Sequence, residues 1–462
     1  MLSYALTILA LFMVLVLIIN LSACAFTLLL SLFQFRRLES SFPDATEEPP
    51  YENTPFVSVH VAVHDEPADL VIATLDALAA LNYDHFEVVL IDNNSPDTAT
   101  WHPVRDHMAQ LGPHFRFFER QNVRGAKAGA LNIARLEMNS AATFIAVIDA
   151  DYQVVPDFLN IAVSSCADAD FVQFPQAYRN SAKADLVARE LSDYFALYPK
   201  SANRFGTALP TGTLSMIRVN WLDKVGGWPT ASITEDAEIG VALWLAGANG
   251  LFVDKVVGRG LLPINLDGLR IQRERWVAGN AQTLLGWLRS VQSPPNGALS
   301  VLTQLTAWPA FLAVPLMALT LILACRLFLP APLTVSFEVA EVISIVTIFA
   351  TIMALLVRAL VTSRLDTLAV KFALVWTSSF SWLPVLWGQT LGFRRTPKTA
   401  GSPQSALSVD TIGSLIAGSL AVGFLWVGHP ITAAIIGLTS IGMATAPFVD
   451  RSLRRCSLTL GL

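Results

Sequence analysis

Hydrophobic residues follow two different patterns along the chain. Long apolar runs with few charged residues cover residues 4–35 and most of the chain after residue 300, whereas residues 57–297 alternate short apolar runs with polar stretches. A run of about 20 apolar residues is long enough to cross the hydrocarbon core of a bilayer. The pattern therefore predicts membrane helices on both sides of a middle domain.

The middle domain shows the alternation of strands and helices that is typical of an α/β fold. The β-branched run Val57–Val63 predicts a strand, Ala68–Leu81 predicts a helix, and Phe86–Ile91 and Thr143–Ile148 predict two further strands. Strands that alternate with helical segments argue for a parallel sheet with helices on its faces. We therefore predict one large α/β domain over residues 37–297.

The first apolar run is open to two interpretations, a secretory signal peptide or a membrane-spanning helix. It has no basic residue at its start, it is far longer than the apolar part of a signal peptide, and it ends at Arg36 and Arg37 rather than at small residues suited to cleavage. We therefore predict that residues 1–36 form a spanning helix with both arginines on the cytoplasmic side.

Residues 298–462 are predicted to form a second membrane region. Its apolar runs cover residues 300–329, 337–361, 367–392, 410–428 and 430–449. The basic clusters at 358–371, 394–398 and 451–455 should all be cytoplasmic, which leaves the run 367–392 with positive charge at both ends. That run is rich in aromatic residues, which suits a helix lying in the membrane interface. We predict five crossings in the whole chain; six crossings, with the last arginines outside, is the alternative.

Composition and charge support this division. Only 15% of the 462 residues are charged, compared with about 25% in soluble domains, and the mean hydropathy is +0.51. Residues 298–462 carry a net charge of +5 and residues 1–35 carry none, so residues 36–297 must carry −10 for the chain to total −5. An acidic middle domain argues against nucleic-acid binding. The four cysteines have no C-x-x-C spacing, which argues against a zinc site.

Acidic residues follow three predicted strands in succession: Glu66, Asp92, and the pair Asp149 and Asp151. Parallel sheets bind ligands beyond the carboxyl ends of their strands, so this pattern favours a site over three unrelated turns. Alternate residues of an extended chain point the same way, which brings the side chains of Asp149 and Asp151 to one side. Carboxylates with that spacing suit Mg²⁺ or Mn²⁺, which would neutralise a diphosphate. The alternative is an acidic turn.

Two further motifs each have a structural and a catalytic interpretation. Thr234-Glu235-Asp236 is either the acidic N-terminus of a helix or a segment that carries a general base. The segment 272–276, Q-R-E-R-W, is either an interface helix whose arginines reach the membrane surface or a binding element. In the second case Arg275 would bind a diphosphate and Trp276 would stack on a sugar ring.

In this order, the motifs resemble those of processive family-2 membrane glycosyltransferases, the group that contains the bacterial cellulose and β-glucan, chitin and hyaluronan synthases. The signature of that family is three aspartate motifs followed by Q-x-x-R-W, matched here at Asp92, at 149–151, at 234–236 and at 272–276. His64-Asp65-Glu66-Pro67 resembles the end of the family's first strand, near the uracil. The resemblance implies an α/β domain of the GT-A type, which binds a nucleotide sugar, inserted between transmembrane α-helices.

Shorter segments strengthen the resemblance. Gly125–Asn132 resembles the K-A-G-A-L-N segment near the nucleotide, and Gly212-Thr213 resembles the loop that touches the acceptor sugar. Residues 393–400 resemble the gating loop of cellulose synthases, F-x-V-T-x-K. Two positions depart from the family. Asn93 stands where many members carry a second aspartate, and Arg395 stands where valine is usual.

The resemblance implies a role for each matched residue. Asp236 would be the catalytic base. The nucleotide sugar would be held by Glu66, Asp92, Lys127, Asp149, Gln272 and Arg275. A Mg²⁺ or Mn²⁺ ion would be held by Asp149 and Asp151. The acceptor would contact Gly212, Thr213 and Trp276, and the gating loop would act through Phe393, Thr396 and Lys398.

The function implied is an inverting polysaccharide synthase of the bacterial cytoplasmic (inner) membrane that exports its product through the membrane helices. The segment Trp276–Gln282 is closer to the W-x-x-G-x-x-Q continuation of glucan-making members, which favours UDP-glucose as the donor and a β-glycan as the acceptor. The linkage is left open between β-1,3 and β-1,4. One alternative is a non-processive glycolipid glucosyltransferase with a ceramide-type acceptor. Another is a non-enzymatic membrane transporter or scaffold.

Overall fold

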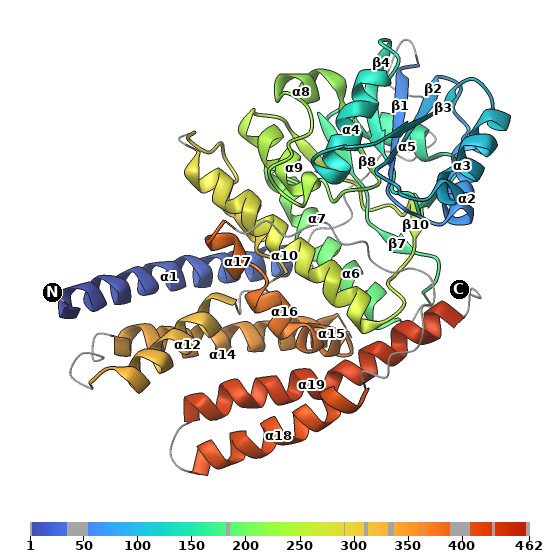
Figure 1. Cartoon of the computed structure of the whole chain (residues 1–462). Helices are drawn as coiled ribbons and strands as arrows, with labels where there is room; N and C mark the ends of the chain where they lie inside the picture. Colours follow the sequence, from blue (N-terminus) through green and yellow to red (C-terminus); the bar gives the residue numbers. More distant parts are fainter. Residues whose placement is uncertain are drawn as a thin grey trace.

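The chain forms an α/β domain that sits on a layer of long apolar helices (Figure 1). The computed structural model describes residues 2–34, 54–181, 185–290, 292–308, 313–330, 337–362, 364–388, 407–426 and 430–458. Two helices, α6 (Leu186–Leu197) and α10 (Leu266–Arg289), lie between the domain and the apolar layer. The predicted order of apolar helix, α/β domain and apolar helices is therefore present.

The α/β domain is built on a seven-stranded sheet of order β3-β2-β1-β4-β8-β6-β9. The strands are β1 (Phe56–Val63), β2 (Phe86–Asn93), β3 (Phe115–Arg120), β4 (Ala142–Val147), β6 (Phe171–Gln173), β8 (Ser215–Arg218) and β9 (Gly250–Phe252). The strands β3, β2, β1 and β4 are parallel to one another, as predicted, but β8 runs antiparallel to both of its neighbours. The predicted parallel sheet is therefore present over β3, β2, β1 and β4, but β8 makes the whole sheet mixed.

Helices cover both faces of this sheet. They are α2 (Ala68–Ala79), α3 (Thr98–Leu111), α4 (Ala126–Glu137), α5 (Phe158–Ser165), α8 (Val219–Lys224) and α9 (Glu235–Leu245). Alternate residues of β2 point to opposite faces. Val88 and Leu90 join a core with Leu75 of α2, and Val89 and Ile91 join a core with Ala130 of α4. Both faces are buried, which is why the predicted strands read as nearly continuous apolar runs.

A second, smaller sheet closes one edge of the site. It consists of β5 (Gln153–Val154), β10 (Gly258–Gly260) and β7 (Ala177–Tyr178). Its central strand β10 pairs antiparallel with β5 and parallel with β7. Because β5 follows the Asp149–Asp151 segment directly, the small sheet fixes the course of the chain just after those carboxylates.

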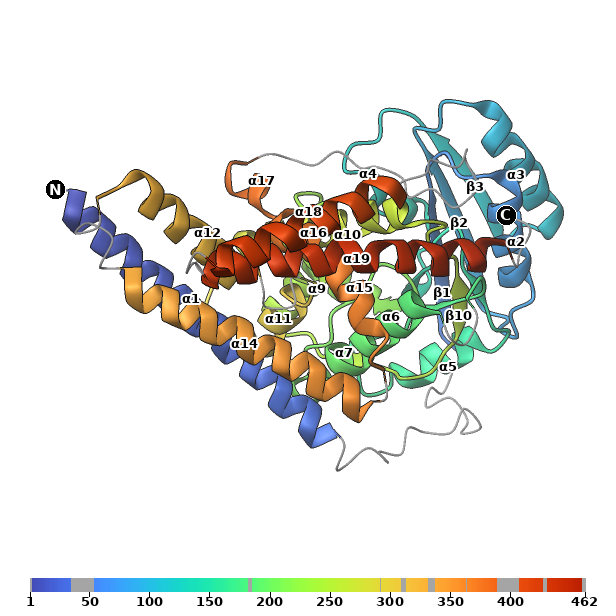
Figure 2. The same ribbon diagram turned by 90° about the horizontal axis from the view of Figure 1, so that it is seen from below.

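The apolar layer contains long helices and a broken one. Its elements are α1 (Leu2–Gln34), α11 (Ala298–Leu305), α12 (Ala313–Phe328), α14 (Glu338–Val361), α15 (Thr367–Ala373), α16 (Val375–Phe380), α17 (Leu383–Leu386), α18 (Leu407–Trp426) and α19 (Pro430–Leu458). Figures 1 and 2 show α1 beside α14 and α18 beside α19. Within the described residues, two helices, Leu2–Ala23 and Glu338–Leu360, are long and apolar enough to cross a membrane. A third candidate span is a bent pair of helices, Thr367–Ala373 with Val375–Leu386, if the pair is counted as one span.

The predicted interfacial helix over residues 367–392 is not continuous. The described part of that run, up to residue 388, forms α15, α16 and α17, and the chain bends by 55° between the first two. Pro384 lies in the first turn of α17, where a missing backbone N–H is tolerated. The number of crossings and the interfacial position of this run stay predictions. The gating-loop residues Phe393, Thr396 and Lys398 lie outside the described residues.

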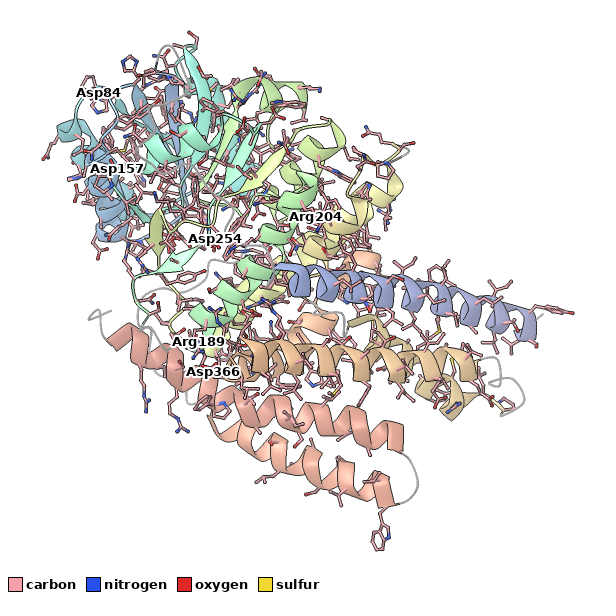
Figure 3. The ribbon with its side chains drawn as sticks, turned by 180° about the vertical axis from the view of Figure 1, so that it is seen from behind. Asp84, Asp157, Arg189, Arg204, Asp254 and Asp366 are labelled. Atoms are coloured by element: carbon pink, nitrogen blue, oxygen red, sulfur yellow. The ribbon has the colours of Figure 1, made fainter. Side chains whose placement is uncertain are left out.

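Ion pairs and hydrogen bonds join the α/β domain to the helical layer. Arg189 of α6 pairs with Asp366 at the start of α15 at 2.5 Å, and Figure 3 labels both residues. Arg358 of α14 pairs with Asp193 of α6 at 2.7 Å. At the first turn of α10, the backbone N–H of Leu266 donates to Asp450 of α19 at 2.8 Å. The helix α19 therefore contributes to holding α10 in its position, together with α9, α11, α16 and α17.

Candidate active site

A cavity of about 570 Å³ lies beyond the carboxyl ends of β1 and β4. The sheet order reverses at these two strands, because β2 and β3 continue to one side of β1 and β4 lies on the other. Open α/β sheets bind their ligands at this kind of point. Nine of the predicted site residues line the cavity: Glu66, Lys127, Asp149, Asp151, Gly212, Asp236, Gln272, Arg275 and Trp276.

Two other predicted residues lie behind the wall of the cavity. Asp92 is 1% exposed, and its Oδ2 accepts a hydrogen bond from the Ser95 hydroxyl at 3.0 Å. Burial raises the pKa of this carboxyl. The cavity is lined instead by its neighbours Asn93 and Asn94. Thr213 is fully buried, and its hydroxyl accepts from the backbone N–H of Asp149 at 3.0 Å, so it positions the start of the 149–151 segment.

Lys127 contacts residues on three sides of the cavity. Its ammonium group lies 2.5 Å from Asp149 Oδ1, 2.5 Å from the carbonyl oxygen of Gly212 and 3.2 Å from Glu235 Oε1. Burial alone would lower the pKa of Lys127, but Asp149 and Glu235 raise it above its usual value. Lys127 therefore stays a cation, and it neutralises part of a strongly acidic cluster.

Asp236 lies in the first turn of α9, half-buried in the cavity wall. Burial, followed by the neighbouring Glu235 carboxylate, raises the pKa of Asp236 to about 7, although Lys127 opposes the shift. A carboxylate with a pKa near the working pH is suited to taking up a proton. The structural interpretation of the 234–236 segment is therefore confirmed, because Asp236 lies in the acidic first turn of a helix, while its role as a base stays a prediction that its place in the cavity wall allows.

Gly212 allows the backbone to pass close to Asp236. Its φ is +86°, a region that glycine adopts without strain. A Cβ atom at this position would lie 3.1 Å from Asp236 Oδ2 and 3.6 Å from the ammonium of Lys127. The Gly212-Thr213 match thus has a physical cause, since each residue contacts an acidic segment of the site.

The Q-x-x-R-W spacing places its three characteristic residues on one face of α10. Gln272, Arg275 and Trp276 are separated by three and four positions, which on a helix brings side chains to the same side. All three are half-buried, and all three line the cavity. Arg275 interacts electrostatically with Glu235, Asp149 and Asp236 on the opposite walls. This face supplies the cavity with a guanidinium group and a flat aromatic ring.

The residues that continue the motif hold the segment that carries Asp236. The Ser232 hydroxyl donates to the carbonyl oxygen of Gly279 at 2.9 Å, and Gln282 Oε1 accepts from the backbone N–H of Ile233 at 2.9 Å. A Cβ atom on Gly279 would lie 2.3 Å from Thr234 Oγ1, so only glycine allows this approach. The W-x-x-G-x-x-Q pattern therefore has a packing role, and it gives weaker support to glucose than the sequence suggested.

The two metal-ligand candidates face the same cavity. Asp149 is partly exposed, and Asp151 is 2% exposed with its Oδ2 accepting from the backbone N–H of Leu261 at 3.0 Å. The described part of the chain holds no group of three or more side chains that together resemble a metal site. Two carboxylates nevertheless fit the donor set of Mg²⁺ or Mn²⁺, which usually takes one or two carboxylates together with substrate phosphates.

Sequence reasoning missed several residues of the cavity. Glu235 belonged to a recognised motif but received no role, and it contacts Lys127. Gln176 donates to the carbonyl oxygen of Thr211 at 2.6 Å, and both line the cavity. His64 approaches the carbonyl oxygen of Asn93 at 2.7 Å. The histidine lay in a quoted match, whereas nothing in the sequence marked Gln176 or Thr211.

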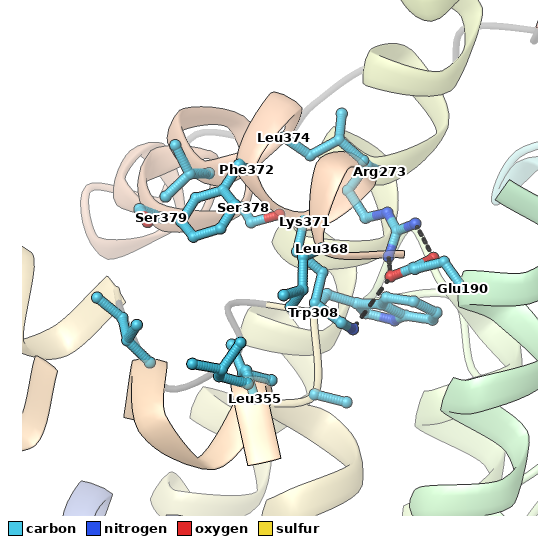
Figure 4. Close-up of a pocket in the computed structure, with 14 residues that line it drawn as sticks. Glu190, Arg273, Trp308, Leu355, Leu368, Lys371, Phe372, Leu374, Ser378 and Ser379 are labelled. Atoms are coloured by element: carbon cyan, nitrogen blue, oxygen red, sulfur yellow. Dashed lines mark hydrogen bonds and ion pairs between the residues drawn. The ribbon is translucent and has the colours of Figure 1, made fainter. Parts of the chain in front are cut away.

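Two smaller cavities continue from the main one toward the apolar helices. A cavity of about 40 Å³ shares Asp236 and Trp276 with the main cavity and adds Trp308. A third, of about 160 Å³, shares Trp308 and is walled mainly by apolar residues of α14, α15 and α16 (Figure 4). Trp308 therefore lines both smaller cavities, and the 40 Å³ cavity connects its surroundings with Asp236 and Trp276.

The sheet order, the acidic strand ends and the cavity at their edge define a class of protein, a GT-A-type domain that binds a nucleotide sugar. Comparison with known families agrees. The model for Glycosyl transferase family group 2 matches residues 144–394, more than half of the chain, and the model for Glycosyl transferase family 2 matches residues 58–226. The chain belongs to glycosyl transferase family group 2, and the predicted family-2 glycosyltransferase is confirmed.

Characterised relatives include synthases of β-linked polysaccharides. Glucomannan 4-beta-mannosyltransferase 7 of Arabidopsis thaliana is 26% identical over 242 residues, which cover 50% of this chain and 43% of the relative. The cellulose synthase catalytic subunit [UDP-forming] of Xanthomonas axonopodis pv. citri (strain 306) is 25% identical over 240 residues, 49% of this chain and 32% of the relative. The matches thus span less than half of the length of these two relatives.

A solved structure shares the fold. The mannosyltransferase PcManGT from Pyrobaculum calidifontis, in complex with GDP-Man and Mn²⁺, aligns with a TM-score of 0.52 and 20% identity, covering 76% of this chain and 99% of that one. At this level of identity the likeness supports the fold alone. It agrees with the predicted GT-A-type α/β domain.

Proposed function

We propose that this chain is an inverting, membrane-embedded polysaccharide synthase that transfers a hexose from a nucleoside diphosphate sugar to a growing β-glycan. One observation carries the proposal: a raised-pKa carboxylate, two cations and a tryptophan ring line a single cavity at the reversal point of the sheet. They are Asp236, Lys127, Arg275 and Trp276. The polysaccharide synthases among the relatives support a polymeric product.

The chemical step follows from these positions. Asp236 takes the proton from an acceptor hydroxyl while the oxygen of that hydroxyl attacks the anomeric carbon of the donor sugar. The bond between that carbon and the diphosphate oxygen breaks on the opposite face, its electrons stay with the diphosphate, and the configuration inverts. Arg275 and Lys127 offset the negative charge of the leaving group. Trp276 offers a flat apolar surface for the acceptor ring.

A divalent metal ion is part of the proposal. Asp149 and Asp151 would hold Mg²⁺ or Mn²⁺ together with the diphosphate, and when bound the ion supplies further positive charge to the leaving group. Glu66 lines the same cavity and would contact the nucleotide. Asp92 would act from behind, by supporting Asn93 and Asn94, which line the cavity.

The proposed donor is UDP-glucose, and GDP-mannose is the second candidate. The glucan-like continuation of Q-x-x-R-W favours glucose. The support is weaker because Gly279 and Gln282 of that continuation pack against the segment that carries Asp236. Mannosyltransferases among the relatives favour mannose. A choice between uracil and guanine depends on the wall formed by His64, Asn93 and Asn94, which receives the base in this proposal.

The membrane arrangement is proposed from charge and length. The α/β domain would face the cytoplasm of a bacterial cell, with five crossings of the inner membrane and the 393–400 segment acting as a gating loop. Two of the described helices are long and apolar enough to cross a membrane, which supports part of this assignment. The product would leave past Trp308 and between the apolar helices.

A second candidate function has a specific observation in its favour. The 160 Å³ cavity beyond Trp308 is walled mainly by apolar side chains, including Ile352, Leu355 and Phe372. Such walls suit the hydrocarbon part of a lipid acceptor, so a non-processive glycolipid glucosyltransferase is the alternative. A non-enzymatic transporter or scaffold agrees poorly with a chain of this family in which every predicted acidic site residue lines or supports one cavity.

A donor screen with product analysis tests the proposal. Purified protein in detergent is incubated with Mn²⁺ or Mg²⁺ and radiolabelled UDP-glucose, UDP-N-acetylglucosamine or GDP-mannose, and the product is sized and its linkage determined. A polymer from one donor, absent with Asp236→Asn, is expected. A lipid-soluble monosaccharide product would replace the polymer proposal by the glycolipid one, and no nucleotide release with any donor would overturn both.

A further inference from the structure

Arg273 belongs to the Q-R-E-R-W motif but does not line the catalytic cavity. It is 2% exposed, and its guanidinium group pairs with Glu190 of α6 at 2.9 Å and 3.4 Å. Glu190 is 3% exposed and lies 3.6 Å from the ammonium group of Lys371 on α15. Figure 4 shows the three residues converging from three different helices. Although burial alone would raise the pKa of Glu190, Arg273 and Lys371 hold it below its usual value.

This buried cluster is a weak source of stability. Taking charges out of water costs several kcal/mol per ion, and well-packed apolar side chains often replace a buried ion pair without loss. The local surroundings are already rich in such side chains, including Leu374 and Trp308. What the ion pair adds is a defined position for the guanidinium group, because two bonds to one carboxylate fix its plane.

The fixed guanidinium group lies against two tryptophan rings. Its central carbon is 4.2 Å from the ring centre of Trp308 and 5.3 Å from that of Trp276, both within the range of cation–π attraction. The two indole rings are 4.7 Å apart and inclined by 33°. Trp308 also stacks on Tyr194, with the ring centres 4.2 Å apart and the ring planes inclined by 18°. Arg273 therefore belongs to a single stack that includes Trp276.

We propose that Arg273, anchored by Glu190, is a positioning residue that sets the orientation of the Trp276 and Trp308 rings beside Asp236. The inference rests on the proposed function, in which Trp276 receives the acceptor sugar. Both rings line the small cavity that also contains Asp236, so a tilt of either ring moves the acceptor hydroxyl away from the base. Loss of the stack releases the acceptor more often between transfers, while donor binding on the opposite side stays the same.

Arg273→Met is the principal variant. Methionine fills the volume of the apolar part of the side chain, and Lys371 remains near Glu190, so the carboxylate is not left without a cation. Arg273→Lys keeps the charge, and Glu190→Gln keeps a hydrogen-bond acceptor for Arg273 but removes the charge of the anchor. Arg270→Ala is the matched control, because Arg270 lies on the same helix and pairs with Asp267 at the surface.

The first measurement reports the rings directly and does not depend on activity. Two indoles at this separation couple excitonically, which gives a circular-dichroism couplet that can be isolated as the wild-type spectrum minus that of Trp308→Phe. Arg273→Met and Glu190→Gln should lose most of this difference signal, Arg273→Lys should retain part of it, and Arg270→Ala should keep it whole. An undiminished couplet in Arg273→Met would overturn the proposal.

The second measurement separates acceptor retention from donor use. Arg273→Met should shorten the mean product about tenfold at fixed donor concentration, with KM for the donor changed less than about twofold and partial rescue by Arg273→Lys. A variant with unchanged product length, or with the loss confined to donor KM, would overturn the proposal. If the wild-type protein makes no polymer, the proposed function fails, and the couplet still decides whether Arg273 orients the rings.

Discussion

Arg273 and Arg275 stand two positions apart on α10, and they meet opposite surroundings. Arg273 is 2% exposed, and its guanidinium group forms an ion pair with Glu190. Arg275 lines the 570 Å³ cavity and interacts with several carboxylates across it. Two positions on a helix correspond to a rotation of about 200°. The helix α10 therefore carries a buried arginine in an ion pair on one side and, on the other side, an arginine that faces the cavity.

The same contrast separates the two cavities. In the polar one, Asp149, Glu235 and Asp236 crowd around Lys127, and carboxylates outnumber cations until a positively charged or metal-bound ligand arrives. In the apolar one, Glu190 is matched by Arg273 and Lys371. A substrate site keeps strong fields that act on the reacting atoms, whereas the buried carboxylate of a structural cluster is compensated by the cations beside it. The difference supports the proposal that the polar cavity is the one that performs the chemistry.

The largest effect is expected from Asp236→Asn. Loss of the base should lower kcat about 10³-fold, because the amide cannot take up the acceptor proton. Binding of UDP or GDP, measured by titration in detergent, should stay within about threefold of wild type. A variant that polymerises sugar at the normal rate would remove Asp236 from its proposed role.

The next effect should distinguish the two arginines. Arg275→Ala should lower kcat/KM for the donor about 10²-fold, since a cation beside the leaving group is lost. Arg270→Ala, at a partly exposed residue of α10 that does not line the cavity, should change it less than twofold. Steady-state kinetics with the donor identified by the screen provides the test. Equal donor defects in Arg275→Ala and Arg273→Met would break the comparison between the two positions.

Gly212→Ala should have an intermediate effect on catalysis. Its Cβ would meet Asp236 Oδ2 at 3.1 Å and displace the base, so kcat should fall about tenfold. Gly226→Ala is the matched control, because Gly226 has the same φ of +86° but nothing within 4 Å of the added atom. Both variants share the backbone strain, so only a difference between their rates is informative. Identical rates would mean that the approach to Asp236 does not matter.

The smallest effect is a displacement of the pH profile. Asp236 acts as a base only when deprotonated, so log kcat should rise with pH and level off above about 7, where burial and Glu235 have raised its pKa. Glu235→Gln removes a neighbouring negative charge and should shift this acidic limb to lower pH. Rates across pH 5 to 9 in constant ionic strength provide the measurement. An unchanged limb in Glu235→Gln would contradict the assignment of the limb to Asp236.

The local pattern of the sequence was sufficient for much of the domain. The strands β1, β2 and β4 and the helix α2 begin and end within two residues of their predicted bounds, because buried β-branched runs and turn residues mark them clearly. The gathering of Asp149, Asp236 and Arg275 was also predicted, through ordered motifs rather than through periodicity. Gly212 and Thr213 were assigned to the acceptor, and the structure gives each a contact with an acidic segment.

Features that depend on distant contacts were not predictable from local pattern. Glu190, the partner of Arg273, lies 83 positions earlier in the chain, and nothing near either residue signals the pairing. The antiparallel direction of β8 has no local mark in the sequence, and the 55° bend between α15 and α16 occurs where no proline or glycine interrupts the run. Asp92 is expected to contact the nucleotide through the family resemblance, and local pattern did not show that its side chain accepts a hydrogen bond from Ser95 behind the cavity wall.

The bond between Leu266 and Asp450 also has a consequence for how the protein is made. The first turn of α10, which leads into Gln272 and Arg275, donates a hydrogen bond to a residue that the ribosome adds 184 positions later. A nascent or truncated chain that lacks α19 has the catalytic motifs but not this support for the helix that carries them. This support for α10 is therefore complete only after α19 has been made and has packed beside it.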